Sequence, residues 1–321
     1  MTTSGAVGVP TKPPGEPCVL HLVRAANGLE PFTAFLESYH AHPAGVAHEL
    51  AIVFKGFRTP SDADAYLRIA GEKVSEAVFV DDEGFDLSAY FAATARLQRP
   101  RYCFLNSFTE IRADGWLALM NRALDDPTVG LVGATGSWAS IRSYLRFHLG
   151  LGGAYAGIFD GRAQTRATMD RLVSRRGTVA SPPPSWLAGK LATAAEMRTQ
   201  ALWFDSFPSH HVRTNAFMLS DEVCTQMHVR RLRTKVDAYR LESGRGSITR
   251  HVERLGLRPV IVTCDGAIHD VAAWAASGVF WQRDQGRLLV ADNQTRDYTH
   301  GDAEIRLLLS RYAWGELADP S

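Results

Sequence analysis

Small polar residues follow an apolar run in the stretch Arg101–Trp116. The run Tyr102–Leu105 stops at Asn106 and Ser107, and a polar turn leads into a predicted helix. A buried strand that ends in polar groups places them at the carboxyl edge of a sheet, which is where ligands bind in open α/β sheets. The pattern therefore predicts a ligand cleft at Asn106 and Ser107. The alternative is that both residues only complete a turn.

A single acid, Glu242, is a candidate for proton transfer. It follows the run Ala238–Leu241, which is predicted to be extended, and it precedes a helix predicted to start near Ser247. A carboxylate within hydrogen-bond reach can take the proton from a hydroxyl group as that oxygen attacks. Asp237 is the other acid nearby. The alternative is an ion pair between Glu242 and a neighbouring arginine near the helix N-terminus.

Two further strand ends carry polar residues. Arg24 and Asn27 stand in the loop after the first predicted strand, and Asp81 and Asp82 follow the third. A carboxylate at a strand end can bind the base or ribose of a nucleotide, and a loop after a first strand suits phosphate or base contacts. The alternatives are a solvated acidic turn and an ordinary loop.

Two later blocks are also rich in hydrogen-bonding groups. In the block 210–215, Arg213 and Asn215 are donors suited to pyrophosphate and to hydroxyl groups. The adjacent His210 and His211 would point to opposite sides of a strand, so they are not expected to chelate one metal. The block 292–296 is predicted to be either a polar loop over the cleft or a capping turn before a surface helix.

Strands and helices alternate along the chain, which predicts an α/β fold with a mostly parallel central sheet and helices on both faces. The predicted strands are Val19–Arg24, Leu50–Lys55, Ala77–Val80, Tyr102–Leu105, Val129–Val132, Val212–Leu219 and Pro259–Thr263. The predicted helices are Leu29–His40, a segment from Thr59 to about Ala70, Leu87–Leu97, Asp114–Leu124, Trp138–Leu149 and Ser247–Leu255.

Composition and charge narrow the classes of function. The chain has 321 residues, 45% of them hydrophobic, and a formal net charge of +1. The hydrophobic content is ample for a core, and the charge gives no reason to expect a nucleic-acid partner. The four cysteines are far apart, so reduced thiols are expected rather than a disulfide framework. No apolar segment reaches the length of a membrane span, and no signal peptide is apparent, so a cytoplasmic protein is expected.

The chain is predicted to hold one folded domain. Residues 1–17 are rich in Gly, Pro, Ser and Thr and are expected to form a disordered tail. Residues 18–321 show no shift in composition that would divide them. Within them, 177–200 is a candidate lid or linker, because it begins with an irregular stretch containing Pro182, Pro183 and Pro184.

The order of these elements resembles that of GT-A glycosyltransferases, and most of all the large inverting family of polysaccharide and glycan synthases. The likeness covers roughly Val19 to Thr263 and rests on short blocks: LHLVRAANGLEPF, RYCFLNSFTEI, VGLVGATGSWAS, HHVRTNAFMLS and RLESGRGSITRHVERLGLRPVIV. The blocks VGATGSW, VRTNAFMLS and ADNQTR look like those of an uncharacterised bacterial branch. The resemblance implies a GT-A-like domain, a nucleotide-sugar donor, and a glycan or other hydroxyl acceptor.

The resemblance also assigns roles. Glu242 would be the catalytic base. The residues expected to bind the nucleotide sugar are Arg24, Asn27, Asp81, Asp82, Asn106, Ser107, Arg213 and Asn215. The family's metal-binding Asp-x-Asp reads Asn106-Ser107-Phe108 here, so Asn106 and Glu110 are the candidate ligands for Mg²⁺ or Mn²⁺. Because the second Asp is missing, dependence on a divalent ion is expected to be weak or absent, with Arg24 and Arg213 carrying the charge of the leaving group.

Two functions from different classes follow. The first is a glycosyltransferase that moves a sugar from a nucleotide-diphosphate donor to a glycan, lipid-linked or small-molecule acceptor, as in bacterial polysaccharide biosynthesis. The second is a non-catalytic GT-A-like module that binds a glycan or a partner enzyme. A dinucleotide-dependent dehydrogenase is disfavoured, because only Gly28 follows the first strand where that class needs a glycine-rich fingerprint.

Overall fold

A computed structural model of the chain describes residues 16–159, 165, 168–169, 202–227, 232 and 234–319. Of the predicted tail 1–17, only Glu16 and Pro17 lie within the described residues. The candidate lid or linker 177–200 lies wholly outside them.

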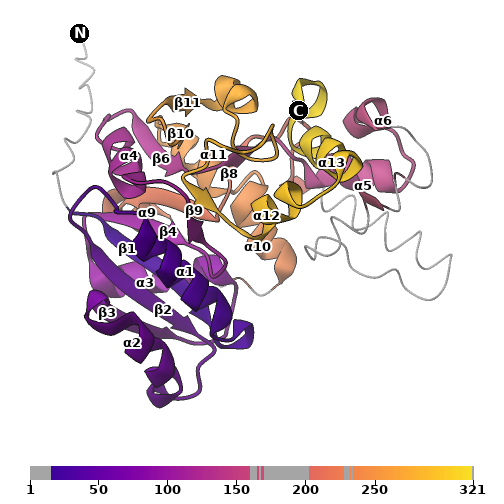
Figure 1. The fold of residues 1–321 in the computed structure, drawn as a ribbon. Coiled ribbons are helices and arrows are strands. Elements are labelled where there is room, and N and C mark those ends of the chain that lie inside the picture. The colour runs from indigo at the N-terminus through magenta and orange to yellow at the C-terminus, as the bar shows by residue number, and fades with distance from the viewer. Residues whose placement is uncertain are drawn as a thin grey trace, which may run out of the picture.

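The described elements follow the predicted alternation of strands and helices (Figure 1). The strands are β1 Cys18–Arg24, β2 Glu49–Lys55, β3 Glu76–Val80, β4 Arg101–Leu105, β5 Glu110–Ile111, β6 Val129–Gly133, β7 Gly136–Ser137, β8 His211–Val212, β9 Ala216–Ser220, β10 Arg258–Val262, β11 Ile268–Asp270 and β12 Val290–Ala291. The helices are α1 Glu30–Ala41, α2 Asp64–Ala70, α3 Asp86–Leu97, α4 Trp116–Ala123, α5 Ile141–His148, α6 Ala154–Ile158, α9 Asp221–Gln226, α10 Lys235–Ser243, α11 Ile248–Arg254, α12 Asn293–Thr299 and α13 Ala303–Trp314.

A central sheet of eight strands has the order β11-β10-β6-β9-β4-β1-β2-β3. The neighbours β4, β1, β2 and β3 pair in parallel, and so do β6 and β10. Strand β9 is antiparallel to both β4 and β6, and β11 is antiparallel to β10. The expected α/β fold with a mostly parallel sheet is therefore confirmed.

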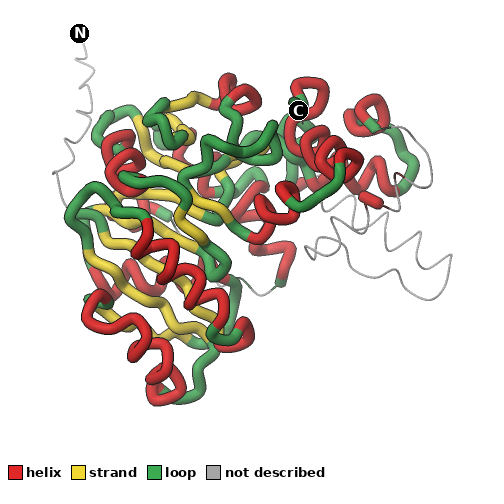
Figure 2. The backbone as a smooth tube through the Cα atoms, viewed as in Figure 1, coloured by secondary structure: helices red, strands yellow, loops and turns green. Residues whose placement is uncertain are grey.

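Helices cover both faces of this sheet (Figure 2). Successive residues of β1 point to opposite faces, as in any strand, so they enter two separate cores. Leu20 and Leu22 pack with α3, whereas Val19 and Val23 pack with α1 and α4. Because both faces are buried, the strands read as continuous apolar runs in the sequence.

Two of the simpler expectations can be compared directly with the structure. All four cysteines are free, and three of them are buried. Burial raises the pKa of Cys18 to about 12, so this thiol stays protonated. None of the helices among the described residues is both long and apolar enough to cross a membrane.

The predicted strand Val212–Leu219 is wrong as a single element. It is divided into β8 and β9, with Arg213, Thr214 and Asn215 between them. The run is apolar at both ends, so its hydrophobicity did not reveal the break. The break matters because it turns Arg213 and Asn215 away from any strand ladder and places them at the edge of the sheet.

Two other predicted elements need correction. Ala238–Leu241 is not extended but lies within α10, which starts with a capping box between Thr234 and Asp237. The helix predicted over Trp138–Leu149 begins only at Ile141, because the Ser140 side chain accepts a hydrogen bond from the Ser143 N–H at 3.1 Å and caps it.

Candidate functional site

Three chain segments meet at the carboxyl edge of β4 and β6. Since β9 runs antiparallel between these strands, its amino end lies at the same edge. The Asn106 N–H donates to the Asn215 carbonyl at 3.0 Å, and the Ala134 N–H donates to the Ala216 carbonyl at 3.0 Å. The polar residues after β4 and β6 and before β9 are therefore held together by backbone hydrogen bonds.

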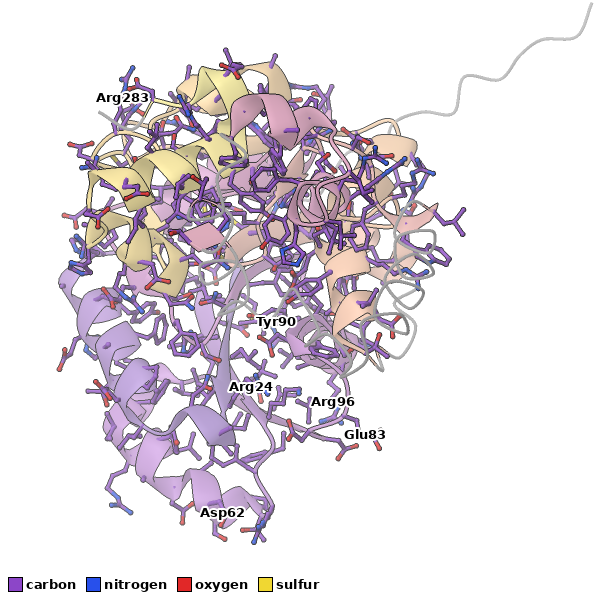
Figure 3. The ribbon with its side chains drawn as sticks, turned by 90° about the vertical axis from the view of Figure 1, so that its right-hand side faces the viewer. Arg24, Asp62, Glu83, Tyr90, Arg96 and Arg283 are labelled. Atoms are coloured by element: carbon purple, nitrogen blue, oxygen red, sulfur yellow. The ribbon has the colours of Figure 1, made fainter. Side chains whose placement is uncertain are left out.

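A cavity of about 250 Å³ opens at this edge. We call it the central cavity. It is lined by Asp86, Leu87, Tyr90, Asn106, Ser137, Ala139, Ile141, His211, Arg213, Thr214, Asn215, Tyr239, Glu242, Ser243, Phe280, Trp281, Asp292, Asn293, Gln294 and Tyr312. Figure 3 labels one of them, Tyr90, between the N-terminal part of the fold and the helices above it, with Arg24 below. Asn106, Arg213, Asn215 and Glu242 thus line one cavity.

An ion pair forms one wall of the central cavity. The Nη2 atom of Arg213 donates to Oδ2 of Asp292 at 2.7 Å, and only 8% and 1% of the two side chains are exposed. The guanidinium also lies over the ring of Phe280, 3.9 Å from its centroid. Asp292 has a second task, because its side chain accepts from the Thr295 N–H at 2.9 Å and caps α12. The block 292–296 is therefore a capping turn that also faces the cleft.

The amide of Asn215 is the end of a short hydrogen-bond chain. Arg213 Nη1 donates to Thr135 Oγ1 at 3.2 Å, and this hydroxyl donates to Asn215 Oδ1 at 2.7 Å. The Nδ2 atom of Asn215 is buried and has no partner in the part of the chain that the structure describes. A buried donor without a partner costs about 1–3 kcal/mol, so this nitrogen is a candidate ligand contact.

His211 also lines the central cavity, half-buried. Burial lowers the pKa of His211 to about 4, and the positive charge of Arg213 adds to this shift. A hydrogen bond from Nδ1 to the Ser209 carbonyl at 2.9 Å works in the opposite direction. The imidazole is therefore neutral at physiological pH.

Besides Asp292, two acids line the central cavity, and they come from α3 and α10. Asp86 is at the start of α3, where burial raises its pKa and the charge of Arg24, 3.8 Å away, opposes that shift. Glu242 is in the last turn of α10 and is half-buried. Burial and then the negative charge of Glu242 raise the pKa of Tyr239, which lies on the same helix. The charge of Glu242 therefore acts on the hydroxyl group of Tyr239, another residue that lines the cavity.

Three of the residues predicted to bind the nucleotide lie apart from the central cavity. Arg24, Asn27 and Ser107 line a narrow crevice with His21, Phe32 and their neighbours, and we call it the first-loop crevice. It has no space large enough for a water molecule. The buried atoms Arg24 Nε, Asn27 Nδ2, Ser107 Oγ and both ring nitrogens of His21 have no hydrogen-bond partner among the described residues. A nucleotide base would therefore have to open this crevice, and Arg24 at its rim is the accessible group.

Asp81 and Asp82 line neither the central cavity nor the first-loop crevice. Asp82 pairs with the buried Lys55, whose Nζ lies 3.1 Å from Oδ1. Lys55 also donates to the Gly84 carbonyl at 2.9 Å. The acidic turn therefore satisfies a buried lysine, which is a structural use of Asp82.

The two candidate metal ligands have other partners. Oδ1 of Asn106 accepts from the Phe108 N–H at 3.0 Å and from Thr109 Oγ1 at 3.1 Å, which is the turn alternative. Glu110 is paired with Arg296 at 2.5 Å. Among the described residues, no three His, Cys, Asp or Glu side chains gather in a way that could hold a metal ion. Asn106 and Glu110 therefore do not fit Mg²⁺ or Mn²⁺ in this arrangement.

Several residues of the cavity wall lie outside the site that the sequence predicts. Phe280 and Trp281 stack with ring centroids 4.0 Å apart, and both are fully buried. Trp281 has a left-handed backbone, with φ at 54°, which is costly for a bulky residue. Its N–H donates to the buried Gln285 side chain at 3.0 Å, and its indole donates to the Gln294 carbonyl at 3.0 Å. The sequence signal was weak: two glutamines spaced three apart in an otherwise loop-like stretch.

The solved structures to which the chain is similar include the following distant likenesses. No protein-family model matches the chain. No curated protein matches it either. Among solved structures, mouse xyloside xylosyltransferase 1 is similar at 12% identity and a TM-score of 0.38, over 78% of this chain and 86% of that one. A 4-diphosphocytidyl-2C-methyl-D-erythritol synthase from Anaerococcus prevotii is similar at 10% identity and a TM-score of 0.36, over 71% and 83%. A CMP:2-keto-3-deoxy-manno-octonic acid synthetase is similar at 10% identity and a TM-score of 0.38, over 77% and 90%.

Proposed function

We propose that this chain is a glycosyltransferase that binds a nucleotide-diphosphate sugar at the carboxyl edge of its sheet and transfers the sugar to a hydroxyl group. The acceptor is a glycan, a lipid-linked sugar or a small molecule. The observation that carries the proposal is the convergence of Asn106, Arg213, Asn215 and Glu242 on the central cavity. These residues come from three of the sequence blocks that resemble GT-A glycosyltransferases, and the cavity lies where open α/β sheets bind ligands.

In this proposal Glu242 is the general base. Its carboxylate takes the proton of the acceptor hydroxyl while the hydroxyl oxygen bonds to the anomeric carbon of the donor. The bond from that carbon to the phosphate oxygen breaks as the new bond forms, and the nucleoside diphosphate leaves with the bonding electron pair. Attack from the face opposite the leaving group inverts the anomeric centre, as the resemblance to inverting enzymes implies.

The charge of the leaving diphosphate needs positive or donating groups. Arg213 is paired with Asp292, but its guanidinium carries five N–H donors, and Asp292 and Thr135 take only two of them. Arg24 is half-buried at the rim of the first-loop crevice and is only loosely paired with Asp86, at 3.8 Å. These two arginines are the proposed contacts of the diphosphate, and no step of this mechanism uses a metal ion.

A donor and acceptor screen tests the proposal. The purified chain is incubated with UDP-, dTDP-, GDP- and CMP-sugars and a mixture of hydroxyl acceptors, with Mn²⁺ or with EDTA, and the released nucleotide is measured by chromatography. Release that depends on the acceptor, and that falls strongly in Glu242→Gln, is the expected result. Glu222→Gln, an exposed acid on α9, is the matched control. If no donor sugar binds and none is consumed, the proposal is wrong.

A second candidate is a non-catalytic module that binds a glycan or a partner enzyme. The charges of the cavity favour it: Arg213 is already neutralised by Asp292, and the two candidate metal ligands are engaged elsewhere. A module of this kind would bind sugars without turnover, so the screen separates the two functions. Binding of a glycan that is unaffected by Glu242→Gln, together with no release of nucleotide, would favour the module.

A further inference from the structure

We propose that His211 and Asn215 together recognise one sugar hydroxyl group in the central cavity, one residue as a hydrogen-bond acceptor and the other as a donor. His211 accepts a hydrogen bond from the hydroxyl group, and Asn215 donates one to it. The proposal rests on the proposed function and deepens it, because it names the chemical group that this part of the cavity recognises.

The orientation of the Asn215 amide follows from its neighbours. Arg213 can only donate, so Thr135 Oγ1 accepts from it and keeps its own hydrogen for Asn215 Oδ1. With the amide turned around, the buried Thr135 hydroxyl would face two donors, and its own hydrogen would have no acceptor there. Nδ2 is therefore the atom of Asn215 that remains for a ligand. Only 3% of Asn215 is exposed, and its Nδ2 has no partner within the described ranges.

The polarity of His211 follows from one backbone contact. A carbonyl oxygen only accepts, so the Nδ1 atom 2.9 Å from the Ser209 carbonyl must carry the hydrogen. In the neutral ring Nε2 is then a bare acceptor. This nitrogen has no hydrogen-bond partner in the part of the chain that the structure describes. The lowered pKa of His211 supports the neutral form, since desolvation and the nearby Arg213, His210 and Arg250 all disfavour a positive charge.

A hydroxyl group matches this pair better than a phosphate does. A hydroxyl both donates and accepts, so it can satisfy His211 and Asn215 together. An ionised phosphate oxygen only accepts, and its charge would meet the lone pair of His211. The cavity also contains Asp86, Glu242 and Asp292, which further disfavours a phosphate beside His211. The diphosphate is therefore expected to contact other residues, and the sugar is expected to lie against β8 and the start of β9.

Calorimetric titration tests whether His211 and Asn215 bind the sugar rather than the diphosphate. Binding of UDP-glucose is compared with binding of UDP, and the pairs dTDP-glucose with dTDP and GDP-mannose with GDP are treated in the same way. His211→Asn can keep the hydrogen bond to Ser209 but has no Nε2, and Asn215→Asp keeps the acceptor for Thr135 but replaces the donor. Each variant is expected to weaken binding of the nucleotide sugar about fivefold to tenfold more than binding of the nucleotide. A difference of this size corresponds to the loss of one neutral hydrogen bond. The exposed His300→Asn is the control.

The outcomes separate this proposal from the proposed function. If the variants weaken binding of the nucleotide sugar and of the nucleotide equally, or weaken neither, the proposed roles of His211 and Asn215 are wrong. That outcome leaves the proposed binding of a nucleotide sugar intact. A wild-type chain that binds none of the three sugars or nucleotides contradicts the proposed function, and the pair with it.

Nitrogen NMR of the wild-type chain covers the case in which a variant does not fold. The His211 ring, assigned with His211→Asn or by backbone connectivity, is expected to be neutral with hydrogen on Nδ1. Its Nε2 resonance is expected to move when the nucleotide sugar is added and to stay in place with the nucleotide alone. Hydrogen on Nε2, or equal movement with both ligands, would overturn the proposal. Thr135→Val frees the Asn215 amide to rotate and is expected to reduce the preference for the nucleotide sugar.

Discussion

The guanidinium of Arg213 and the carboxylate of Asp292 meet at 2.7 Å although 79 positions separate them in the chain. Both are more than nine-tenths buried, so each depends on the other for its charge to be tolerated. The pair joins the edge of the central sheet to the start of α12 at the wall of the central cavity. It is therefore both a structural tie and a wall of the site.

Removing one partner of this ion pair is expected to destabilise the fold strongly. Asp292→Ala leaves the buried Arg213 charge unpaired, which typically costs about 3–5 kcal/mol, and it also removes the cap of α12, which typically costs about 1 kcal/mol. Urea denaturation measures the change in the free energy of unfolding. Asp302→Ala is the control, because Asp302 caps α13 at an exposed position, accepting from the Ile305 N–H at 2.9 Å. Equal losses in the two variants would show that the ion pair adds nothing.

Glu242→Gln is expected to lower turnover by about 10²–10⁴-fold and to leave donor binding unchanged. The amide keeps the size of the side chain and cannot take a proton. Single-turnover release of nucleotide and calorimetric binding of the donor measure the two effects separately. Glu222→Gln should match the wild type in both. Near-normal turnover in Glu242→Gln would exclude this carboxylate as the base and would direct attention to Asp86.

Arg24→Gln is expected to weaken binding of the nucleoside diphosphate about tenfold, because a charged contact contributes about 1.5–3 kcal/mol and Arg24 is partly solvent-exposed. The measurement is calorimetric titration with UDP and with uridine. Only UDP should be affected, since uridine lacks the phosphates. The matched control is Arg96→Gln, an exposed arginine on α3 that donates to the Phe79 carbonyl at 2.7 Å. Equal weakening of uridine would instead assign Arg24 to the base or ribose.

His21 is expected to make the fold sensitive to acid. Burial lowers the pKa of His21 to about 3, below the ordinary value of 6.5. Below pH 6.5 the unfolded chain therefore binds a proton at this ring, whereas the folded chain does not. The free energy of unfolding consequently falls as the pH drops towards 3. The loss from this residue between pH 7.5 and 5.0 is about 2 kcal/mol.

His21→Phe tests this contribution, because a phenyl ring can keep the stacking on Phe35, where the centroids lie 3.7 Å apart. The difference between the free energies of unfolding at pH 7.5 and pH 5.0 should shrink by about that amount relative to the wild type. His300→Phe, at an exposed position, controls for the added ring. A pH dependence that is the same in wild type and His21→Phe would contradict the prediction.

The fold was more predictable than the site. Each strand of the central sheet from Val19 to Val132 is predicted to within about one residue of its position, because buried parallel strands form apolar runs between turn residues. The short strand β5 is not predicted. The run 212–219 does not show its break, because the run is apolar at both ends and Arg213 within the break pairs with groups far away in the chain, Thr135 and Asp292. Ala238–Leu241 misled because its capping box lies further upstream, at Thr234.

The partners of the site residues could not be read from the sequence. Nothing local indicates that Glu110 faces Arg296, that Asp82 serves Lys55, or that His211 shares a cavity with Glu242. These contacts join residues that are tens to almost two hundred positions apart, so they depend on the tertiary arrangement. What the sequence does predict is the class of position, a polar residue at the end of a buried strand, and Asn106 after β4 is such a position that lines the central cavity.

The antiparallel strand β9 has a consequence for how the chain folds. It is the strand that joins β6 and β10 to β4 and the rest of the central sheet, and its last residue, Ser220, pairs with Arg101. During synthesis, β4 and β6 are complete long before β9 emerges, and until then each has an open edge. Closing so long a loop is entropically costly and slow, while further lengthening of it adds little cost. The late insertion of one strand is therefore the expected rate-limiting step of folding, and the cleft exists only after it.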